Sequence, residues 1–83
     1  MNREAVFTKL LEIFKKVNID PSFDYSNVNE ETLIFSELGL DSIGFLYMVM
    51  SIQNEFKIKI KNDQFLSLKT IADLINLIEN LQK

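Results

Sequence analysis

Apolar side chains return at steps of three and four residues over the first part of the chain, and this is the period of an α-helix. Charged residues fill most of the positions between them. The recurring apolar residues are Val6, Leu10, Ile13, Phe14 and Val17. The pattern predicts an amphipathic helix from about residue 3 to residue 17, with one face buried against the rest of the protein.

Two further helices are predicted. The stretch from Asp41 to Phe56 is apolar around most of a helix circumference, which predicts a central helix that begins after Gly39 and is capped by Asp41. Thr70 starts the last helix, because Asp73 follows three residues later and completes a variant of the capping box. The buried stripe of this last helix is predicted to be Ile71, Leu74, Ile75, Ile78 and Leu81.

A long connection separates the first two helices. Residues 18 to 39 hold the only proline, Pro21, and many Asn, Asp and Ser residues, so the first helix cannot continue through them. A connection of this length in a small domain either packs through its own apolar side chains or serves a function. The side chains available for packing are Phe23, Tyr25, Val28, Leu33, Ile34, Phe35 and Leu38.

The segment KIKIK, residues 57 to 61, alternates between charged and apolar residues as a β-strand does. No second strand-like run exists to pair with it, so we predict an extended linker that turns Ile58 and Ile60 inward. A short helical turn from Asp63 to Leu66 follows. The fold class is therefore predicted to be all-α, in a single domain over residues 1 to 83.

The residue types that are absent restrict the function. The chain has no His and no Cys, and so lacks the commonest general base, the thiol nucleophile and the usual zinc ligands. We therefore expect neither an autonomous enzyme nor a metal site. A net charge of −3 and only a short cluster of lysines after residue 56 argue against nucleic-acid binding and for protein partners.

The location of the protein is also indicated by charge. Arg3, Glu4 and Lys9 interrupt the apolar run that a signal peptide or a membrane span would need. We therefore expect a cytoplasmic protein without a membrane span, and a monomer by default.

One serine is placed for modification. Ser42 lies just inside the predicted second helix with its hydroxyl toward solvent, although a serine at such a position most often only caps the helix. Asp41 already offers the better cap, and Gly39 lets the preceding backbone bend away. No His or Lys lies nearby in the sequence to take the hydroxyl proton, so a second protein must do the chemistry. A phosphate ester there would gain roughly 0.3 to 1 kcal/mol from the helix N-terminus.

The stretch LGLDSIGFLYMVMSIQNEFKIKI resembles the modification-site helix of acyl carrier proteins, whose core pattern is Gly, any residue, Asp, Ser, then Leu or Ile. Phe56, the I-x-I after it and the start of the last helix at Thr70 also fall where that family places them. The resemblance covers essentially the whole chain. It implies a small four-helix bundle with a long first loop and a short third helix, and it implies 4'-phosphopantetheine on Ser42. The thiol of that arm would hold acyl or aminoacyl groups as thioesters.

The resemblance also implies partners and roles. A phosphopantetheinyl transferase would attach the arm, with Asp41 helping it to engage its metal and Ser42. An acyl- or aminoacyl-loading ligase would charge the arm, and a ketosynthase or acyltransferase would receive its cargo. Ile43 would be an apolar contact for partners and for the core.

The chain departs from the fatty-acid-synthesis members of this family, which carry several Asp and Glu on the exposed face of the modification-site helix. Here that face is predicted to offer Gly44, Tyr47, Gln53 and Asn54, and Glu55 is the only acid in the helix after Ser42. Gly44 is predicted to let a partner backbone or the arm approach closely, unless it is only a tolerated substitution.

An apolar docking patch is predicted in place of the missing acids. Tyr47 and Met50, with Leu40 and Ile43, are the expected partner contacts, because aromatic residues and Met are common interface anchors. The alternative is that Tyr47 and Met50 pack in the core.

Three functions follow from these observations. The leading one is a free-standing carrier for a dedicated polyketide, lipopeptide, aminoacyl or specialised acyl-transfer pathway. The second is the housekeeping carrier of fatty-acid synthesis. The third, from a different class, is an unmodified helical adaptor with the same fold.

Overall fold

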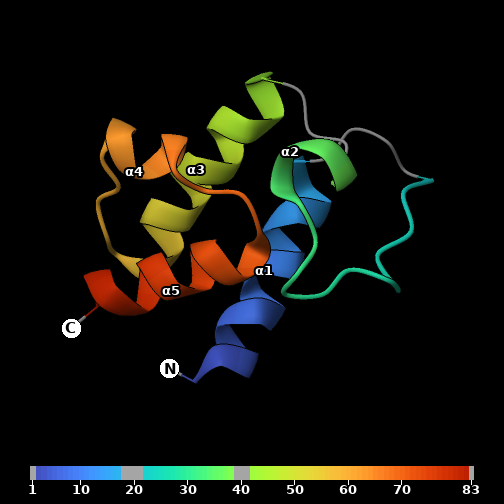
Figure 1. Cartoon of the computed structure of the whole chain (residues 1–83), viewed down its shortest axis with the longest axis horizontal. Helices are drawn as coiled ribbons and strands as arrows, with labels where there is room; N and C mark the ends of the chain where they lie inside the picture. The colour runs from blue at the N-terminus through green and yellow to red at the C-terminus, as the bar shows by residue number, and fades with distance from the viewer. Residues whose placement is uncertain (1, 18–21, 39–41, 83) are drawn as a thin grey trace.

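The computed structural model describes residues 2–17, 22–38 and 42–82 (Figure 1). In these ranges the chain forms five helices: α1 (Arg3–Val17), α2 (Ile34–Glu37), α3 (Ser42–Phe56), α4 (Asn62–Leu66) and α5 (Ile71–Leu81). There is no strand among the described residues. The prediction of a small all-α bundle is confirmed, and the expected short helix is α4. The additional short helix α2 was not predicted.

The three long helices bury their apolar faces together. Helix α1 contacts both α3 and α5, and each of the three contributes one face to a single core. The residues that they bury there are Val6, Leu10, Ile13 and Phe14 from α1, Met48, Val49, Ile52 and Phe56 from α3, and Ile71, Leu74, Ile75 and Ile78 from α5. Phe56, the last residue of α3, is among them and is 5% exposed. Leu81 is only half-buried, so the stripe on α5 ends one turn earlier than predicted.

The long connection packs through some of its own side chains, as predicted. Ile34, the first residue of α2, and Leu38, the residue that follows its end, are fully buried. Phe23, Tyr25 and Val28 are half-buried against the core, and the Tyr25 hydroxyl donates a hydrogen bond to the Phe14 carbonyl at 3.1 Å. The prediction is wrong for Leu33 and Phe35, which are exposed. A helix as short as α2 turns only one side to the core, and Ile34 and Leu38 occupy that side.

Backbone hydrogen bonds fasten this connection to the start of α5. The Ile34 amide donates to the Lys69 carbonyl at 2.9 Å, and Leu33 forms an isolated backbone bridge with Thr70. The first two amides of α5, those of Ile71 and Ala72, donate to the carbonyls of Thr32 and Glu30 at 3.1 and 2.7 Å. The connection therefore satisfies helix-end donors that would otherwise need water or a side chain.

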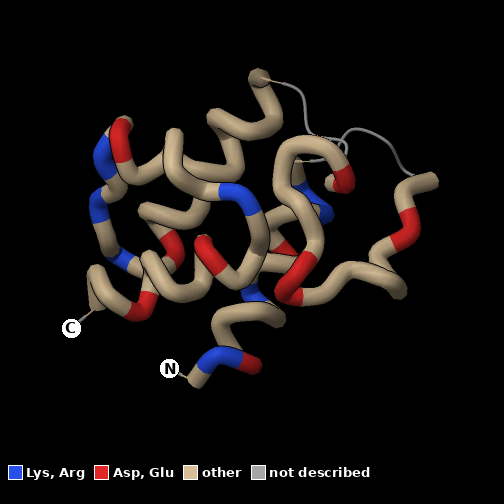
Figure 2. Tube along the Cα trace, in the orientation of Figure 1, with Lys and Arg blue, Asp and Glu red and all other residues tan. Residues whose placement is uncertain are grey.

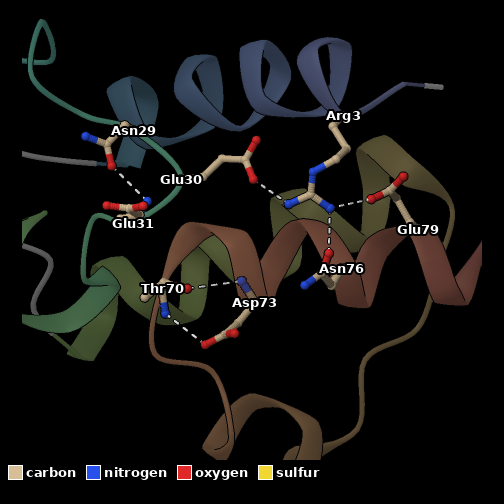
Figure 3. A network of polar contacts seen from close by, with 8 residues as sticks. All are labelled: Arg3, Asn29, Glu30, Glu31, Thr70, Asp73, Asn76 and Glu79. Carbon is tan, nitrogen blue, oxygen red and sulfur yellow. Dashed lines mark hydrogen bonds and ion pairs between the residues drawn. The ribbon is translucent and has the colours of Figure 1, made fainter.

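The predicted capping box at the start of α5 is confirmed (Figure 3). The Asp73 amide donates to the Thr70 hydroxyl oxygen at 3.2 Å, and the Asp73 carboxylate accepts from the amides of Thr70 and Lys69, each at 3.1 Å. These amide hydrogen bonds lower the pKa of Asp73.

One arginine ties three segments together. The Arg3 guanidinium, at the start of α1, donates to Glu30 in the long connection and to Asn76 and Glu79 on α5 (Figure 3). Single exposed ion pairs add little stability, but a shared guanidinium restrains several segments at once.

The segment KIKIK is an extended linker, as predicted. Lys57 adopts a left-handed conformation with φ 56°, which ends α3. The Ile58 amide then donates to the Gln53 carbonyl at 3.2 Å, and the Ile60 amide donates to the Gln53 side-chain oxygen at 2.8 Å. Ile60 is buried and Ile58 half-buried, which confirms their inward direction. Gln53 is only half-exposed, because its side chain binds the linker. The prediction that Gln53 lies on the open face of the helix is therefore wrong.

Every helix in the described part of the chain is too short or too polar to cross a membrane.

Candidate functional site

Ser42 is the first residue of α3, and its side chain is exposed. Both its position at the helix start and its exposure agree with the prediction from sequence. The residues just before it, Gly39, Leu40 and Asp41, lie outside the described residues. The cap by Asp41 and the partner contact by Leu40 therefore stay predictions.

The surroundings of Ser42 fit a phosphodiester. From Ser42 onward, the first turn of α3 contains no acidic side chain that would repel an added negative charge. The helix is 15 residues long, so its amino end carries the partial positive charge of a full helix dipole. The chain has no histidine to activate the hydroxyl. The arrangement can therefore present this hydroxyl to the catalytic groups of another protein.

An apolar stripe runs along α3 from the residue next to Ser42. It consists of Ile43, Leu46, Tyr47 and Met50, whose side chains are 65, 59, 58 and 55% exposed. Their spacing of three, four and seven residues places them on one side of the helix. We refer to these four residues as the α3 stripe. The structure thus brings together three of the predicted partner contacts, Ile43, Tyr47 and Met50, and does not bury Tyr47 or Met50 in the core. The predicted core contact of Ile43 is wrong, because the residue lies on the exposed side of the helix and outside the core.

The exposure of the α3 stripe corrects the predicted central position of the helix and adds Leu46 to the candidate partner contacts. The helix was expected to lie centrally, but it buries only one face, with Met48, Val49, Ile52 and Phe56 in the core, and it leaves the α3 stripe exposed. Leu46 was not predicted as a partner contact. Its position three residues after Ile43 was the signal that could have placed it there.

Gly44 lies on the buried face of α3, not on the exposed face where it was predicted. It precedes Met48 and Ile52 by four and eight residues, and all three are buried. The prediction that a partner or the arm approaches at Gly44 is therefore wrong. The missing side chain instead lets the protein's own interior approach the helix backbone.

A shallow open groove borders the α3 stripe. It is lined by Tyr47, Met50, Ser51, Gln53 and Asn54, none of which is charged. The acid that follows, Glu55, is paired with Lys9 on α1 through atoms 2.6 Å apart, and this hydrogen bond and charge lower the pKa of Glu55. The side chains that α3 offers to a partner are therefore apolar, or polar and uncharged.

Three aromatic rings form a row near the amino end of α3, at Phe45, which lies one turn after Ser42. Phe45 of α3 lies between Phe35 of α2 and Phe65 of α4, with ring centroids 4.6 and 6.2 Å away. Next to this row, the Leu66 side chain of α4 is 87% exposed. Sequence reasoning missed the row, because Phe35 comes close to Phe45 only through the unpredicted helix α2.

Comparison with known proteins places this site in context. A family model described as a phosphopantetheine attachment site matches residues 8–78, a range that includes Ser42. An acyl carrier protein of Campylobacter lari is 37% identical over 70 residues, which cover 83% of this chain and 91% of that protein. An acyl carrier protein homolog of Mycoplasma genitalium is 31% identical over 81 residues, covering 98% of this chain and 93% of its own.

The fold is similar as well. The crystal structure of an acyl carrier protein from Thermotoga maritima matches this structure with a TM-score of 0.79 at 30% sequence identity. The match covers 98% of this chain and 91% of that one.

Proposed function

Because this chain belongs to the acyl carrier protein family, whose prosthetic group is a covalently attached 4'-phosphopantetheine, we propose that Ser42 is the residue that carries the group. Proteins of this family are carriers and not enzymes, and so is this chain. The observation that supports Ser42 is its exposure at the first residue of α3, inside the region that matches the family. When bound, the group supplies a thiol that holds an acyl group as a thioester.

The residues of this chain have a limited part in the attachment. The Ser42 oxygen forms a bond to a phosphorus of the pyrophosphate of coenzyme A, and the bond from that phosphorus to the nucleotide phosphate breaks. The transferase must take the hydroxyl proton, since this chain has no histidine to do so. Helix α3 holds the product phosphodiester at its amino end, where the helix dipole favours the charge.

Intact mass measurement tests the attachment site. After incubation with coenzyme A and a broad-specificity phosphopantetheinyl transferase, the protein should gain the mass of one arm, and Ser42→Ala should gain none. Ser36→Ala is the matched control, because Ser36 is an exposed serine inside a helix but not at its start. Circular dichroism should show the same helix content in all three proteins. A mass gain by Ser42→Ala would contradict the proposal.

We further propose that the chain serves a dedicated pathway of polyketide, lipopeptide, aminoacyl or specialised acyl transfer, and not general fatty-acid synthesis. The supporting observation is the α3 stripe, together with the absence of acidic side chains among residues 42–54 of α3. Basic patches on fatty-acid enzymes need carboxylates to set encounter rate and orientation. The partners would be a phosphopantetheinyl transferase, a loading ligase, and a ketosynthase or acyltransferase with an apolar docking surface.

A charge-addition variant tests this assignment. Tyr47→Glu, Met50→Glu and Asn54→Glu together place three carboxylates on the open face of α3, and Gln53 stays unchanged because it holds the linker. A fatty-acid ketosynthase with a basic patch should use the loaded variant better than the loaded parent, with the gain larger at low salt. The same three substitutions to Gln are the control without charge. Equal activity of parent and Glu variant at every salt concentration would favour the housekeeping assignment.

A further inference from the structure

The two parts of the chain differ in charge. Residues 1–56 carry four basic and nine acidic side chains, whereas residues 57–83 carry five lysines and three acids. Figure 2 shows basic positions gathered along the segment between α3 and α4, and acidic positions along the connection before α2. The molecule extends 36 Å along its longest axis, well beyond the screening length of about 8 Å at physiological salt. A partner at the end of α3 therefore meets local positive charge and not the net negative charge.

This positive charge comes from the basic cluster, which we define as Lys57, Lys59 and Lys61. All three side chains are exposed, because the alternating residues Ile58 and Ile60 turn inward. In the part of the chain that the structure describes, none of the three forms an ion pair, although the charge of Lys57 helps to lower the pKa of Glu55. The basic cluster is therefore available to an acidic surface from outside.

The backbone that carries the basic cluster is held in place. Gln53 accepts two hydrogen bonds from it, one at its carbonyl from the Ile58 amide and one at its side-chain oxygen from the Ile60 amide. Ile60 is also buried in the core. The lysines are thus attached to a fixed segment, and less conformational freedom is lost when they bind a partner.

Lys57 occupies a position that favours glycine. Its φ of 56° and the bond from the Ile58 amide to the Gln53 carbonyl form the left-handed helix end in which glycine is the usual residue. A side chain in this conformation strains the backbone, and strained residues are enriched at functional sites. The presence of lysine at this position favours a use for its charge.

The α3 stripe and the basic cluster follow one another along the axis of α3. Helix α3 begins at Ser42 and ends at Phe56, so its axis spans roughly 22 Å at about 1.5 Å per residue. The stripe begins beside Ser42, and the basic cluster begins at the residue after Phe56. A partner that lies along α3 with its active-site entrance at Ser42 therefore reaches the basic cluster about 20 Å away.

From these observations we propose that the enzymes served by this carrier dock along α3 with an apolar surface on the α3 stripe and a group of Asp and Glu side chains facing the basic cluster. The proposal rests on the proposed function of Ser42, which sets the place of the active-site entrance. Its charge pattern is the reverse of the one by which basic patches select acidic carriers. An anionic membrane is the weaker alternative, because three lysines fall short of the roughly four to eight that mark lipid-binding clusters.

The test measures docking without the arm, so that it does not depend on Ser42 modification. The full chain carrying Ser42→Ala is titrated with a fatty-acid ketosynthase that has a basic docking patch. It is also titrated with a variant of that enzyme in which the patch residues facing the carboxyl end of α3 are replaced by Glu. The charge-reversed enzyme should bind on the order of 10-fold more tightly at low salt, and this preference should shrink at high salt.

Two carrier variants of equal net charge identify the responsible lysines. Lys59→Glu/Lys61→Glu should abolish or invert the preference, whereas Lys15→Glu/Lys16→Glu on α1 should keep it, although both lower the net charge by the same amount. The proposal is overturned if the two variants behave alike, or if the parent shows no preference between the two enzymes. Circular dichroism of both variants should confirm the parent fold.

Two further measurements distinguish binding to a membrane, and failure of the attachment at Ser42, from failure of the docking proposal. Vesicles of phosphatidylserine, compared with vesicles of phosphatidylcholine, should not bind the chain; binding that is lost in Lys59→Glu/Lys61→Glu would assign the basic cluster to a lipid surface and overturn the proposal. The mass of the chain with Ser42 intact, after reaction with the transferase, reports on attachment alone. Loss of attachment with docking retained would contradict only the proposed role of Ser42.

Discussion

Replacing Lys57 by glycine should make the protein more stable, although it removes a charged side chain. Lys57 has φ 56°, and a left-handed conformation costs a residue with a side chain roughly 1 to 2 kcal/mol. Glycine avoids this cost but loses about 0.5 to 1 kcal/mol through its greater freedom in the unfolded chain. The two ranges leave a net gain of 0 to about 1.5 kcal/mol, and its centre of about 0.75 kcal/mol corresponds, for a domain of this size, to a rise in Tm of roughly 3 to 6 °C.

Thermal unfolding followed by circular dichroism measures this change, and Lys57→Ala is the matched control. Alanine removes the same charge but keeps a Cβ atom, so it should leave the backbone strain in place and give no comparable rise in Tm. Lys59→Gly, at a position outside the left-handed region, should be neutral or destabilising. If Lys57→Gly melts at or below the temperature of Lys57→Ala, the strain at Lys57 does not contribute to stability and the reasoning is refuted.

Two further predictions concern the core and the start of α5. Phe56→Ala should lower the free energy of unfolding by about 3 to 5 kcal/mol, because the ring is buried, whereas Tyr47→Ala on the exposed side of the same helix should have little effect; chemical denaturation compares them. The amides of Thr70 and Lys69 lower the pKa of Asp73, so its carboxylate stabilises the fold above its unfolded pKa of about 3.9, and this contribution is lost as the pH falls through the folded value. Asp73→Asn should therefore weaken the pH dependence of stability below about pH 4, and an unchanged profile would contradict the assignment.

The long helices could be predicted from the sequence because local signals mark them. The apolar period of α1 and the capping box at Thr70 and Asp73 depend on residues a few positions apart, and both are present in the structure. The strand suggested by the local alternation at residues 57–61 could be rejected because the whole sequence offers no partner strand.

The features that could not be predicted depend on contacts between distant segments. Helix α2 has four residues, too few for a periodic signal, and it is held by the Lys69 carbonyl and by burial of Ile34. The face that α3 exposes was hidden because apolar residues surround the helix, and only its neighbours decide which of them are buried. For the same reason Gly44 was placed on the wrong face and the aromatic row at Phe45 was missed.

The hydrogen bonds that attach the long connection to α5 affect how such a sequence can evolve. Three of the bonds that hold it join backbone atoms to backbone atoms, at Ile34, Ile71 and Ala72, and such bonds do not depend on which side chains the residues carry. Substitutions can therefore accumulate at the exposed positions of this stretch without detaching it, provided that its buried and half-buried side chains, Phe23, Tyr25, Val28, Ile34 and Leu38, are kept. The exposed positions of the connection beside α3 are thus free to acquire new side chains, and so new preferences for other proteins, while the core beneath them stays the same.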